Sequence, residues 1–530
     1  MKVDRQATVE VLGCPARTFE VCGHHYALVT VTGLEPGSTT PYEVRVDGER
    51  AWPPPVTPFP ASVIRTRGGS SGRTRILFGS CRYPKVPERK ASARLGIDAL
   101  DAYAARAAAL PEQEWPDALL LLGDQVYADE LTPQNRRRIA GRRDRHPDWP
   151  DDEIVSYDEY VGLYQDSWAD PEVRWLMSIV PTAMIFDDHD VRDDWNTSAA
   201  WRAKMNATPW WRDRIRSGLA SYWVYQHIGN LPPDELAADP DYREVAEHGG
   251  DTWPLLVELA DRADAETDGA KGVRFSFRWD LDDVRLVMID SRNGRILEGG
   301  ARLMLGEGEF RWVEEQVAAE GRVDHLVLGT SLPWLLPPAI GDVQSVNEVA
   351  AERPGLRGPL AEAIRRAADL EHWAAFDTSF DRLTRMIRRA AAGGPATVSV
   401  LSGDVHHSYV ARAEFGSSGS DDAGTPALVH QLTCSPVHNH VHWILRPGFT
   451  LGWSRAMARL TRAWSRHARV PPPQVSWERI AGPMFGNIVA TLDLDGREAT
   501  VVFEQPRSAS GLDELARLRL TASTSAAEVL

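Results

Sequence analysis

Two patterns of apolar residues follow one another along the chain. From the amino terminus to about residue 68, short segments such as 8–12 and 26–32 alternate apolar and polar positions. Such alternation is typical of strands with one buried face. The pair Asp47-Gly48 favours a tight turn between two of these strands. We therefore predict a small all-β sandwich over residues 1–68.

From about residue 73, continuous apolar runs alternate with segments of helical character. A continuous run predicts a strand that is buried on both faces, and the intervening helices must then cover the sheet. The predicted strands lie at 76–79, 117–123, 183–186, 275–279, 284–289, 325–329, 396–401, 428–433, 487–494 and 499–503. The predicted helices lie at 90–110, 195–229, 308–320 and 370–392. This alternation predicts an α/β sandwich over residues 73–505.

Two further stretches show no strand pattern. Residues 230–270 are polar and acidic, and we expect them to be an excursion from the sandwich. Residues 506–530 are expected to be a carboxyl-terminal tail. This tail contains helix-forming sequence at 512–520 and ends in a Ser/Thr/Ala segment.

The charge balance limits the partners that the protein attracts. The 530 residues include 59 Lys and Arg against 75 Asp and Glu, a formal net charge of −16. Such a field repels nucleic acids and disfavours adhesion to membranes, so a phosphate substrate needs local positive charge or a metal. Four cysteines indicate no disulfide framework. No apolar run reaches membrane-spanning length. With no signal sequence visible, a cytoplasmic location is expected.

Side chains that can bind a metal follow four of the predicted strands. In an α/β sheet, ligands bind at the carboxyl ends of the strands. A single Asp in such a place is more often a helix cap, so each position alone is a weak indication. Four such strand ends in one domain favour a shared metal site. The residues at these ends are Cys81, Asp124, Tyr127, Asp187, Asp188, His189, Asp404 and His406.

The last of these strand ends, residues 402–408, carries one carboxylate and two imidazoles. In extended conformation Asp404 and His406 would point to one side and His407 to the other. Carboxylate and phenolate oxygens suit Fe³⁺, Mn²⁺, Mg²⁺ or Ca²⁺, while thiolate and imidazole add Fe or Zn. The chain has too few Cys and His for a structural zinc cage. A carboxylate such as that of Asp124 is suited to bridge two ions.

Five motifs around these strand ends resemble those of a known family. They are Phe-Gly-Ser-Cys at 78–81, Gly-Asp-Gln-Val-Tyr-Ala-Asp at 123–129, Asp-Asp-His-Asp at 187–190, Ile-Asp-Ser-Arg at 289–292 and Ser-Gly-Asp-Val-His-His at 402–407. In this order they resemble the alkaline phosphatase D family of calcineurin-like metallophosphoesterases, which are relatives of the purple acid phosphatases. The resemblance runs from about residue 73 to 503 and implies an αββα sandwich. In the amino-terminal module, residues 33–46 resemble a fibronectin type III-like domain.

The family resemblance implies a site for two metal ions. Cys81, Asp124 and Tyr127 would bind Fe³⁺. Asp124 would bridge to a second ion, which is typically Ca²⁺ in this family, and Asp188 occupies the place of a further metal ligand. Mn²⁺, Zn²⁺ or Mg²⁺ are the alternative ions.

The resemblance also implies roles for the remaining motif residues. Asp404 and His406 take the places of two metal-binding histidines, and Asp404 is the better supported ligand of the two. His189 takes the place of a histidine that protonates the leaving group or steadies the phosphate. Arg292 matches an arginine that is either structural or neutralises substrate charge.

The activity implied by the resemblance is hydrolysis of small phosphate mono- or diesters. Two metal ions would activate water for in-line attack on phosphorus. A phospholipase D-type phosphodiesterase is the alternative among enzymes. A rival of another class is a non-catalytic protein that binds a partner and carries a decayed site. The complete set of candidate ligands argues against decay.

Other polar residues near the motifs are expected to support the site rather than bind metal. Asp187 would orient the ligands, and Asp129 and Asp190 could cap helices. His407 would form hydrogen bonds to its neighbours, and Cys434 is expected to be buried nearby.

Six arginines lie between residues 136 and 145, downstream of the Asp124 motif. One interpretation is a solvated loop balanced by the acidic residues at 148–153. The other is a basic lip that gathers phosphate esters against the negative field of the protein.

Overall fold

The computed structural model describes residues 1–69, 72–269, 272–297, 302–321, 323–351, 357–415, 427–440 and 446–521. The Ser/Thr/Ala end of the expected tail lies outside these residues. Within the described residues, no helix is both long and apolar enough to cross a membrane.

The amino-terminal module consists of short strands, as its alternating pattern predicts. The strands are β1 (Lys2–Val3), β2 (Thr8–Val11), β3 (Cys14–Arg17), β4 (Phe19–Val21), β5 (His24–Tyr26), β6 (Thr39–Pro41), β7 (Val44–Val46), β8 (Glu49–Trp52) and β9 (Val63–Arg65). They form sheets in the orders β3-β2-β7-β8, β1-β5-β4 and β6-β9. The strand expected at 26–32 is absent, because the ladder of β5 ends at Tyr26. The likeness to fibronectin type III domains stays a prediction.

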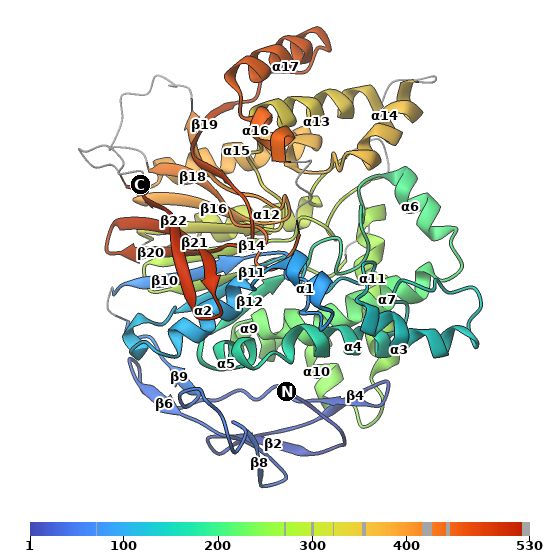
Figure 1. The fold of residues 1–530 in the computed structure, drawn as a ribbon, viewed down its shortest axis with the longest axis vertical. Coiled ribbons are helices and arrows are strands. Elements are labelled where there is room, and N and C mark those ends of the chain that lie inside the picture. Colours follow the sequence, from blue (N-terminus) through green and yellow to red (C-terminus); the bar gives the residue numbers. More distant parts are fainter. Residues whose placement is uncertain are drawn as a thin grey trace.

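The module lies at one end of the molecule, against helices of the larger domain (Figure 1). The backbone N–H of Thr252 donates to the carbonyl of Glu20 at 2.8 Å. The Tyr42 hydroxyl donates to the carbonyl of Ser178 at 2.8 Å. These contacts fix the module to the larger domain.

The larger domain contains two mixed sheets. The strands of the first are β10 (Thr74–Gly79), β11 (Ala118–Leu122), β12 (Thr182–Ile185), β20 (Val489–Asp495), β21 (Glu498–Ser508) and β22 (Gly511–Arg519). The strands of the second are β13 (Phe277–Leu281), β14 (Val284–Ile289), β15 (His325–Thr330), β16 (Thr397–Ser402), β17 (Ser408–Phe415), β18 (Leu428–Thr433) and β19 (Val475–Met484). Their orders are β12-β11-β10-β20-β21-β22 and β13-β14-β15-β16-β18-β17-β19. Strands β10 to β12 run parallel to one another, as do β14, β15, β16 and β18.

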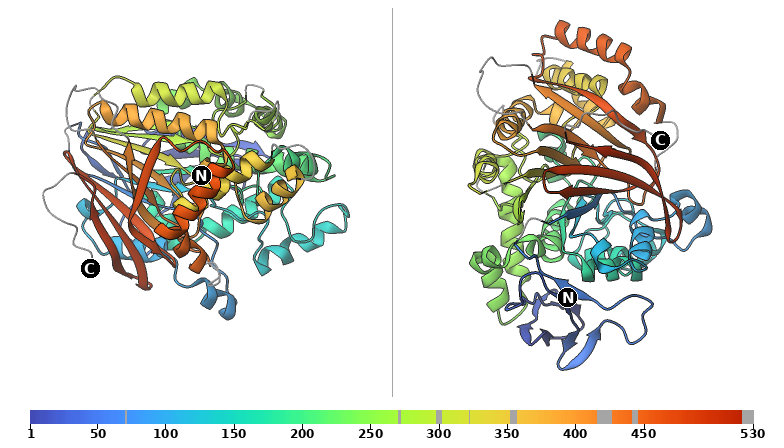
Figure 2. Two further views of the ribbon diagram at one scale, coloured as in Figure 1. Left: turned by 90° about the horizontal axis from the view of Figure 1, so that it is seen from above. Right: turned by 90° about the vertical axis from the view of Figure 1, so that its left-hand side faces the viewer.

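Helices cover the outer faces of both sheets (Figure 2). The helices are α1 (Arg89–Leu95), α2 (Ala99–Ala107), α3 (Pro133–Arg143), α4 (Tyr157–Trp168), α5 (Pro171–Ile179), α6 (Ala199–Asn206), α7 (Trp211–Tyr222), α8 (Ile228–Asn230), α9 (Pro233–Ala238), α10 (Pro240–Glu247), α11 (Trp253–Asp264), α12 (Glu307–Ala318), α13 (Pro338–Ala351), α14 (Arg357–Ala367), α15 (Asp377–Ala392), α16 (Arg446–Gly452) and α17 (Arg455–His467). The pair α2 and α5 packs on the first sheet, and α12 and α15 pack on the second.

The two sheets share a core between them. Phe78 and Leu120 of the first sheet lie in one cluster of buried side chains with Met288 and Leu401 of the second. Alternate residues of the same strands, such as Leu119, point outward to α2 and α5. Both faces of the central strands are thus buried, which accounts for their continuous apolar runs. The αββα sandwich expected from the sequence is confirmed.

Two predictions for segments outside the sheets need correction. The segment at 90–110 forms two helices, because Gly96 adopts a φ of 81° after α1, a value that favours glycine. The Asp98 side chain then caps α2 by accepting the backbone N–H groups of Leu100 and Asp101. Residues 230–270 are not a plain excursion, since they contain α9, α10 and α11.

The helix-forming sequence at 512–520 does not form a helix, because Gly511–Arg519 is the edge strand β22. It pairs antiparallel with β21 and extends the first sheet. Leu518 and Leu520 become buried at this edge. The backbone hydrogen bonds and burial that the sheet edge offers outweigh the helix propensity of the segment.

Candidate metal centre

The parallel strands of both sheets end at one edge of the sandwich, and the five motifs lie at their carboxyl ends. Motif 78–81 ends β10, motif 123–129 follows β11 and motif 187–190 follows β12. On the second sheet, motif 289–292 ends β14 and motif 402–407 ends β16. The loops of the two sheets meet there, as the argument from strand ends predicts.

Glycines allow these loops to approach one another closely. A Cβ added at Gly403 would lie 2.1 Å from Oγ of Ser80, and one added at Gly123 would lie 2.7 Å from Cβ of Asp187. The Cys81 N–H donates to the carbonyl of Gly123 at 3.1 Å. No other residue would fit in these two places without displacing a neighbouring loop.

Four candidate ligands have a left-handed backbone. The φ angle is 56° at Cys81, 51° at Asp124, 65° at Asp404 and 50° at His406. Residues other than glycine rarely adopt this conformation, and those that do cluster at functional sites. The extended alternation expected for Asp404 and His406 is therefore wrong, because the chain turns at both residues. Both still line the same cavity.

The candidate ligands form overlapping groups. Cys81, Asp124 and His406 each offer a ligand atom, and these atoms lie within 4.8 Å of one another. Asp124, Asp188 and His189 form a second group by the same measure. Asp124 belongs to both groups, so its carboxylate lies where a bridge between two ions is required.

Tyr127 lies beside the shared carboxylate. Its hydroxyl donates to Oδ2 of Asp124 at 3.4 Å and accepts a hydrogen bond from Nδ2 of Asn439 at 2.8 Å. Sequence reasoning missed Asn439, which follows β18. The run Val-His-Asn-His at 437–440 is the signal that would have identified this further strand end.

Asp404 joins a third group with Asp187 and Asp188, again within 4.8 Å. Nε2 of His372 lies 2.8 Å from Oδ2 of Asp404. Burial opposes ionisation of Asp404, but His372 and Arg292 outweigh it and hold the pKa of this carboxyl below its usual range. Sequence reasoning also missed His372, because it lies between α14 and α15, away from any strand end.

Several buried atoms of the site lack a partner. Burial, followed by the charges of nearby acidic groups, raises the pKa of Cys81 and of Tyr127 well above the usual range. Burial likewise raises the pKa of Asp124. Oδ1 of Asp124 and Oδ2 of Asp187 accept no hydrogen bond from the described residues. A cation would provide the missing partner and favour the ionised forms. The donor set therefore fits a metal centre.

Asp190 holds the two acidic loops together. Its carboxylate accepts the backbone N–H groups of Asp124 at 3.0 Å, Gln125 at 3.2 Å and Val126 at 3.2 Å. It also accepts the N–H of Asp187 at 2.9 Å. The expected helix cap is wrong, since Asp190 instead joins the loop after β11 to the loop after β12.

His189 lines the cavity next to the candidate ligands. Its Nδ1 lies 2.9 Å from Oδ1 of Asp129. Burial alone would lower the pKa of His189, but Asp129, Asp188 and Asp124 outweigh burial and raise the pKa well above its usual value. Asp129 thus orients the imidazole instead of capping a helix. With Nδ1 held, Nε2 is the nitrogen available to a substrate.

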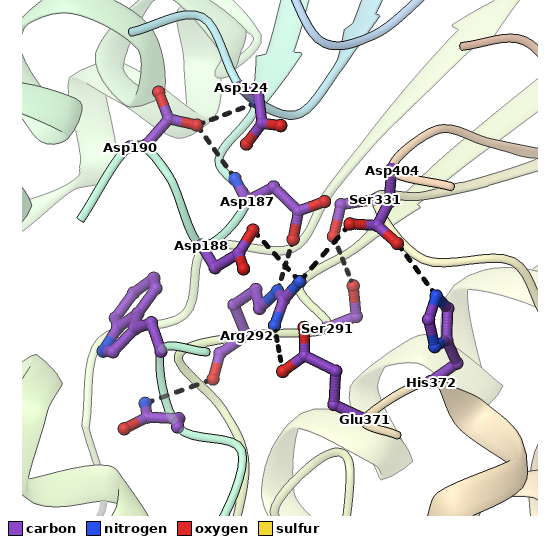
Figure 3. A network of polar contacts seen from close by, with 12 residues as sticks. Asp124, Asp187, Asp188, Asp190, Ser291, Arg292, Ser331, Glu371, His372 and Asp404 are labelled. Atoms are coloured by element: carbon purple, nitrogen blue, oxygen red, sulfur yellow. Dashed lines mark hydrogen bonds and ion pairs between the residues drawn. The ribbon is translucent and has the colours of Figure 1, made fainter. Parts of the chain in front are cut away.

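Arg292 lies at the centre of the acidic cluster and has no exposed surface (Figure 3). Its guanidinium pairs with Asp187, with Glu371 at 2.6 Å and with Asp188 at 3.2 Å, and it lies 3.7 Å from Asp404. It does not line the cavity. This burial favours the structural alternative for Arg292 over contact with substrate.

Replacing Arg292 by Met is expected to destabilise the fold by about 3–5 kcal/mol, because it leaves several buried carboxylates without their cation. The free energy of unfolding in urea measures this effect. The control is Arg311→Met, which removes an exposed pair with Glu307 and is expected to cost about 0.5 kcal/mol or less. Equal losses for the two variants would contradict the structural role.

A cavity of about 960 Å³ opens over the candidate ligands. Five of the candidate residues line it, namely Asp124, Asp188, His189, Asp404 and His406. Cys81 and Tyr127 are buried and do not line it. Part of the lining is apolar and includes Leu336, Pro337, Ile340 and Phe449. Polar groups beside an apolar surface are typical of a site for an organic ligand with one charged group.

His407 and Cys434 lie where support was expected. Nδ1 of His407 bonds the carbonyl of Val405 at 2.7 Å, and its ring stacks on Phe449. Cys434 is buried, and its thiol donates to the carbonyl of Ile488 at 3.5 Å.

The arginine cluster at 136–145 is not a loop, since most of it belongs to α3. Arg138 pairs with Asp166 at 3.0 Å, and Arg143 pairs with Glu159 at 2.7 Å. Both partners lie on α4, not in the acidic segment 148–153. None of these arginines lines the described cavity. Arg138, Arg142 and Arg143 therefore form an ion-paired contact between two helices, which neither interpretation of the sequence included.

Two family models match the sequence. The model of PhoD-like phosphatases matches residues 99–444, and a model of a domain of unknown function (DUF7800) matches residues 1–64. No curated protein matches the chain.

Solved structures also match the chain, and two of them are phosphatases. A structure of PhoD has a TM-score of 0.58 at 11% sequence identity, and the match covers 99% of this chain and 87% of that chain. A purple acid phosphatase from yellow lupin (Lupinus luteus) seeds has a TM-score of 0.48 at 9% identity, with 98% and 70% covered. At this identity, the likeness to PhoD shows a shared fold.

Proposed function

This chain belongs to the PhoD-like phosphatase family, and on that basis we propose that it hydrolyses small phosphate mono- or diesters in the cavity over Asp124. It is a phosphoesterase. One observation carries the proposal: the Asp124 carboxylate is shared by two groups of candidate ligands, has a buried oxygen without a partner, and lines the cavity.

The proposed cofactors are Fe³⁺ and Ca²⁺, with Mn²⁺, Zn²⁺ or Mg²⁺ as alternatives. The proposed ligands of Fe³⁺ are Cys81, Asp124, Tyr127 and His406. The proposed ligands of Ca²⁺ are Asp124, Asp188 and Asp404. Thiolate, phenolate and imidazole suit iron, whereas a set of carboxylates suits calcium, which supports this division. When bound, the two ions polarise the phosphoryl group and favour ionisation of water near neutral pH.

The protein's own residues would position the reactants and move one proton. His189, held through Nδ1 by Asp129, would donate a proton from Nε2 to the leaving oxygen. Arg292 would keep Asp187, Asp188 and Asp404 in place without touching the substrate. The apolar part of the cavity would seat the organic group of the ester.

Metal analysis of the purified protein tests the proposal. Protein never exposed to chelator is expected to contain about one iron and one calcium per chain, as a two-ion site requires. Dialysis against a chelator should remove the activity on a nitrophenyl phosphate and on the bis(nitrophenyl) ester, and adding both ions should restore it. Full activity at a metal content far below one ion per chain would overturn the proposal.

The ratio of the two nitrophenyl activities assigns the preference for monoesters or diesters. The residues that line the described cavity do not by themselves distinguish the phospholipase D-type alternative. The intact ligand set argues against a non-catalytic binding protein. The cytoplasmic location stays a prediction, which fractionation of expressing cells would test.

A further inference from the structure

Helix α17 presents an apolar stripe to solvent at the end of the molecule opposite the amino-terminal module (Figure 1). Leu460 is 65% exposed and Trp464 is 48% exposed. They are four positions apart, so they lie on one side of the helix together with Ala456 and Ala463. Leu451, in α16, is 54% exposed and adds to the apolar surface of this helix pair.

A second side of α17 is fixed to the protein. Thr461 and Ser465 are buried, and the helix packs on α13. The Thr461 hydroxyl donates to Oδ2 of Asp342 on α13 at 3.0 Å. Because this side is held by α13, the helix cannot turn Leu460 and Trp464 inward.

A stripe of arginines runs along the third side of α17. The arginines recur every three or four residues and are Arg455, Arg459, Arg462, Arg466 and, just past the helix end, Arg469. Arg462 pairs with Asp342 at 3.0 Å. The other four have no acidic partner within the part of the chain that the structure describes. This is a local cationic surface on a protein whose formal net charge is −16.

We propose that α17 docks the protein onto the surface of an anionic lipid bilayer. A helix with Leu and Trp on one side and arginines on another is the composition of helices that lie in the membrane interface. The apolar stripe would enter the acyl boundary, and the neighbouring arginines would contact acidic headgroups. Each cation near such a surface adds to the binding.

Other occupants fit this surface less well. Nucleic acid would be attracted by the arginines, but the exposed side chains of Leu460 and Trp464 would then have no apolar partner. A second copy of the chain would meet only a stripe about 20 Å long and roughly 10 Å wide. That area is far below the roughly 800 Å² per partner of a stable protein interface.

The position of α17 connects this surface to the cavity. Phe449 of α16, which precedes α17, lines the cavity and stacks on His407 with ring centroids 4.3 Å apart. Gly452 packs against Pro337 and Ile340, which belong to the apolar part of the lining. Docking through α17 would therefore bring this part of the cavity close to the bilayer.

Flotation with lipid vesicles tests the proposal on the full chain. The protein is expected to float with vesicles that contain about 30% phosphatidylserine in phosphatidylcholine and to remain unbound with pure phosphatidylcholine. About 0.5 M NaCl should weaken the binding, because it screens the arginines. Equal binding to both vesicles, or none to the anionic ones, would overturn the proposal.

Three variants locate the binding surface. Leu460→Ser/Trp464→Ser and Arg455→Gln/Arg459→Gln/Arg466→Gln are each expected to lower vesicle affinity about tenfold or more. The control is Leu12→Ser/Val56→Ser, which removes exposed apolar residues from the amino-terminal module and should leave affinity unchanged. Hydrolysis of a soluble nitrophenyl ester should be unaffected in all three, which verifies folding independently of lipid binding.

Light scattering distinguishes self-association through α17 from docking onto a bilayer. Concentration-dependent dimers that disappear in Leu460→Ser/Trp464→Ser would assign α17 to self-association and contradict the bilayer proposal. A monomer in solution that floats only with anionic vesicles would support it.

Discussion

Replacing Asp124 by Ala is expected to remove both metal ions and to lower kcat/KM at least about 10³-fold, which corresponds to about 4 kcal/mol of transition-state stabilisation. The reason is the position of the side chain. The Asp124 carboxylate is shared by the group with Cys81 and His406 and the group with Asp188 and His189. No single substitution elsewhere in the described residues would affect both groups directly. Metal analysis and steady-state kinetics on the same preparation measure the two effects.

The matched control for this prediction is Glu130→Ala. Glu130 also lines the cavity, but it belongs to none of the ligand groups found among the described residues. Its loss should leave metal content unchanged. The stability of the metal-free protein provides a second control. Burial raises the pKa of Asp124, so its ionised carboxylate lowers the stability of the protein when no metal is bound. Asp124→Ala should therefore be no less stable than the wild type after chelation. An Asp124→Ala protein with full metal content would contradict its bridging role.

The central strands can be predicted from the sequence because burial on both faces requires a continuous run of apolar residues. A run such as 118–122 must be apolar at every position when one face meets the other sheet and one meets α2 and α5. Edge strands lack such a continuous apolar run. Strand β22 has an amphipathic pattern that also suits a helix, and only its pairing with β21 decides the outcome.

Only those residues of the candidate site that directly follow a predicted strand could be identified from the sequence. Asp124, Asp188 and Asp404 follow buried strands, so their convergence follows from the geometry of parallel sheets. His372 lies between two helices and meets Asp404 only through the tertiary fold. The left-handed backbone at Asp404 was equally hidden, because extended and turned loops share the same residue types.

Arg292 shows why residue type alone does not assign a role. A sequence reading leaves contact with substrate and structural support equally open. Burial decides between them, since a guanidinium with no exposed surface that faces Asp187, Asp188 and Glu371 has no access to a ligand in the cavity. Its charge instead permits several carboxylates to converge where they would otherwise repel one another.

Replacing His189 by Ala is expected to leave both metal ions bound and to lower kcat by about 10²–10⁴-fold, the usual contribution of a general acid. His189 lies within 4.8 Å of the Asp124 and Asp188 ligand atoms, so its position alone would also suit a metal ligand. Because Nδ1 of His189 donates its hydrogen bond to Oδ1 of Asp129, Nε2 is left for the leaving oxygen. Metal content therefore separates the two roles: loss of an ion in His189→Ala would make His189 a ligand.

Comparing substrates with different leaving groups tests proton donation by His189 more directly than metal content does. A proton donor matters most when the departing oxygen is strongly basic, so His189→Ala should lose far more activity on an alkyl phosphate than on a nitrophenyl phosphate. Asp129→Asn is the matched control, because it keeps a hydrogen-bond acceptor at Nδ1 and removes the charge. It should retain the metals and show the same dependence on the leaving group at a smaller loss of about tenfold. Equal losses on both esters in His189→Ala would contradict proton donation and leave His189 to orient the phosphate.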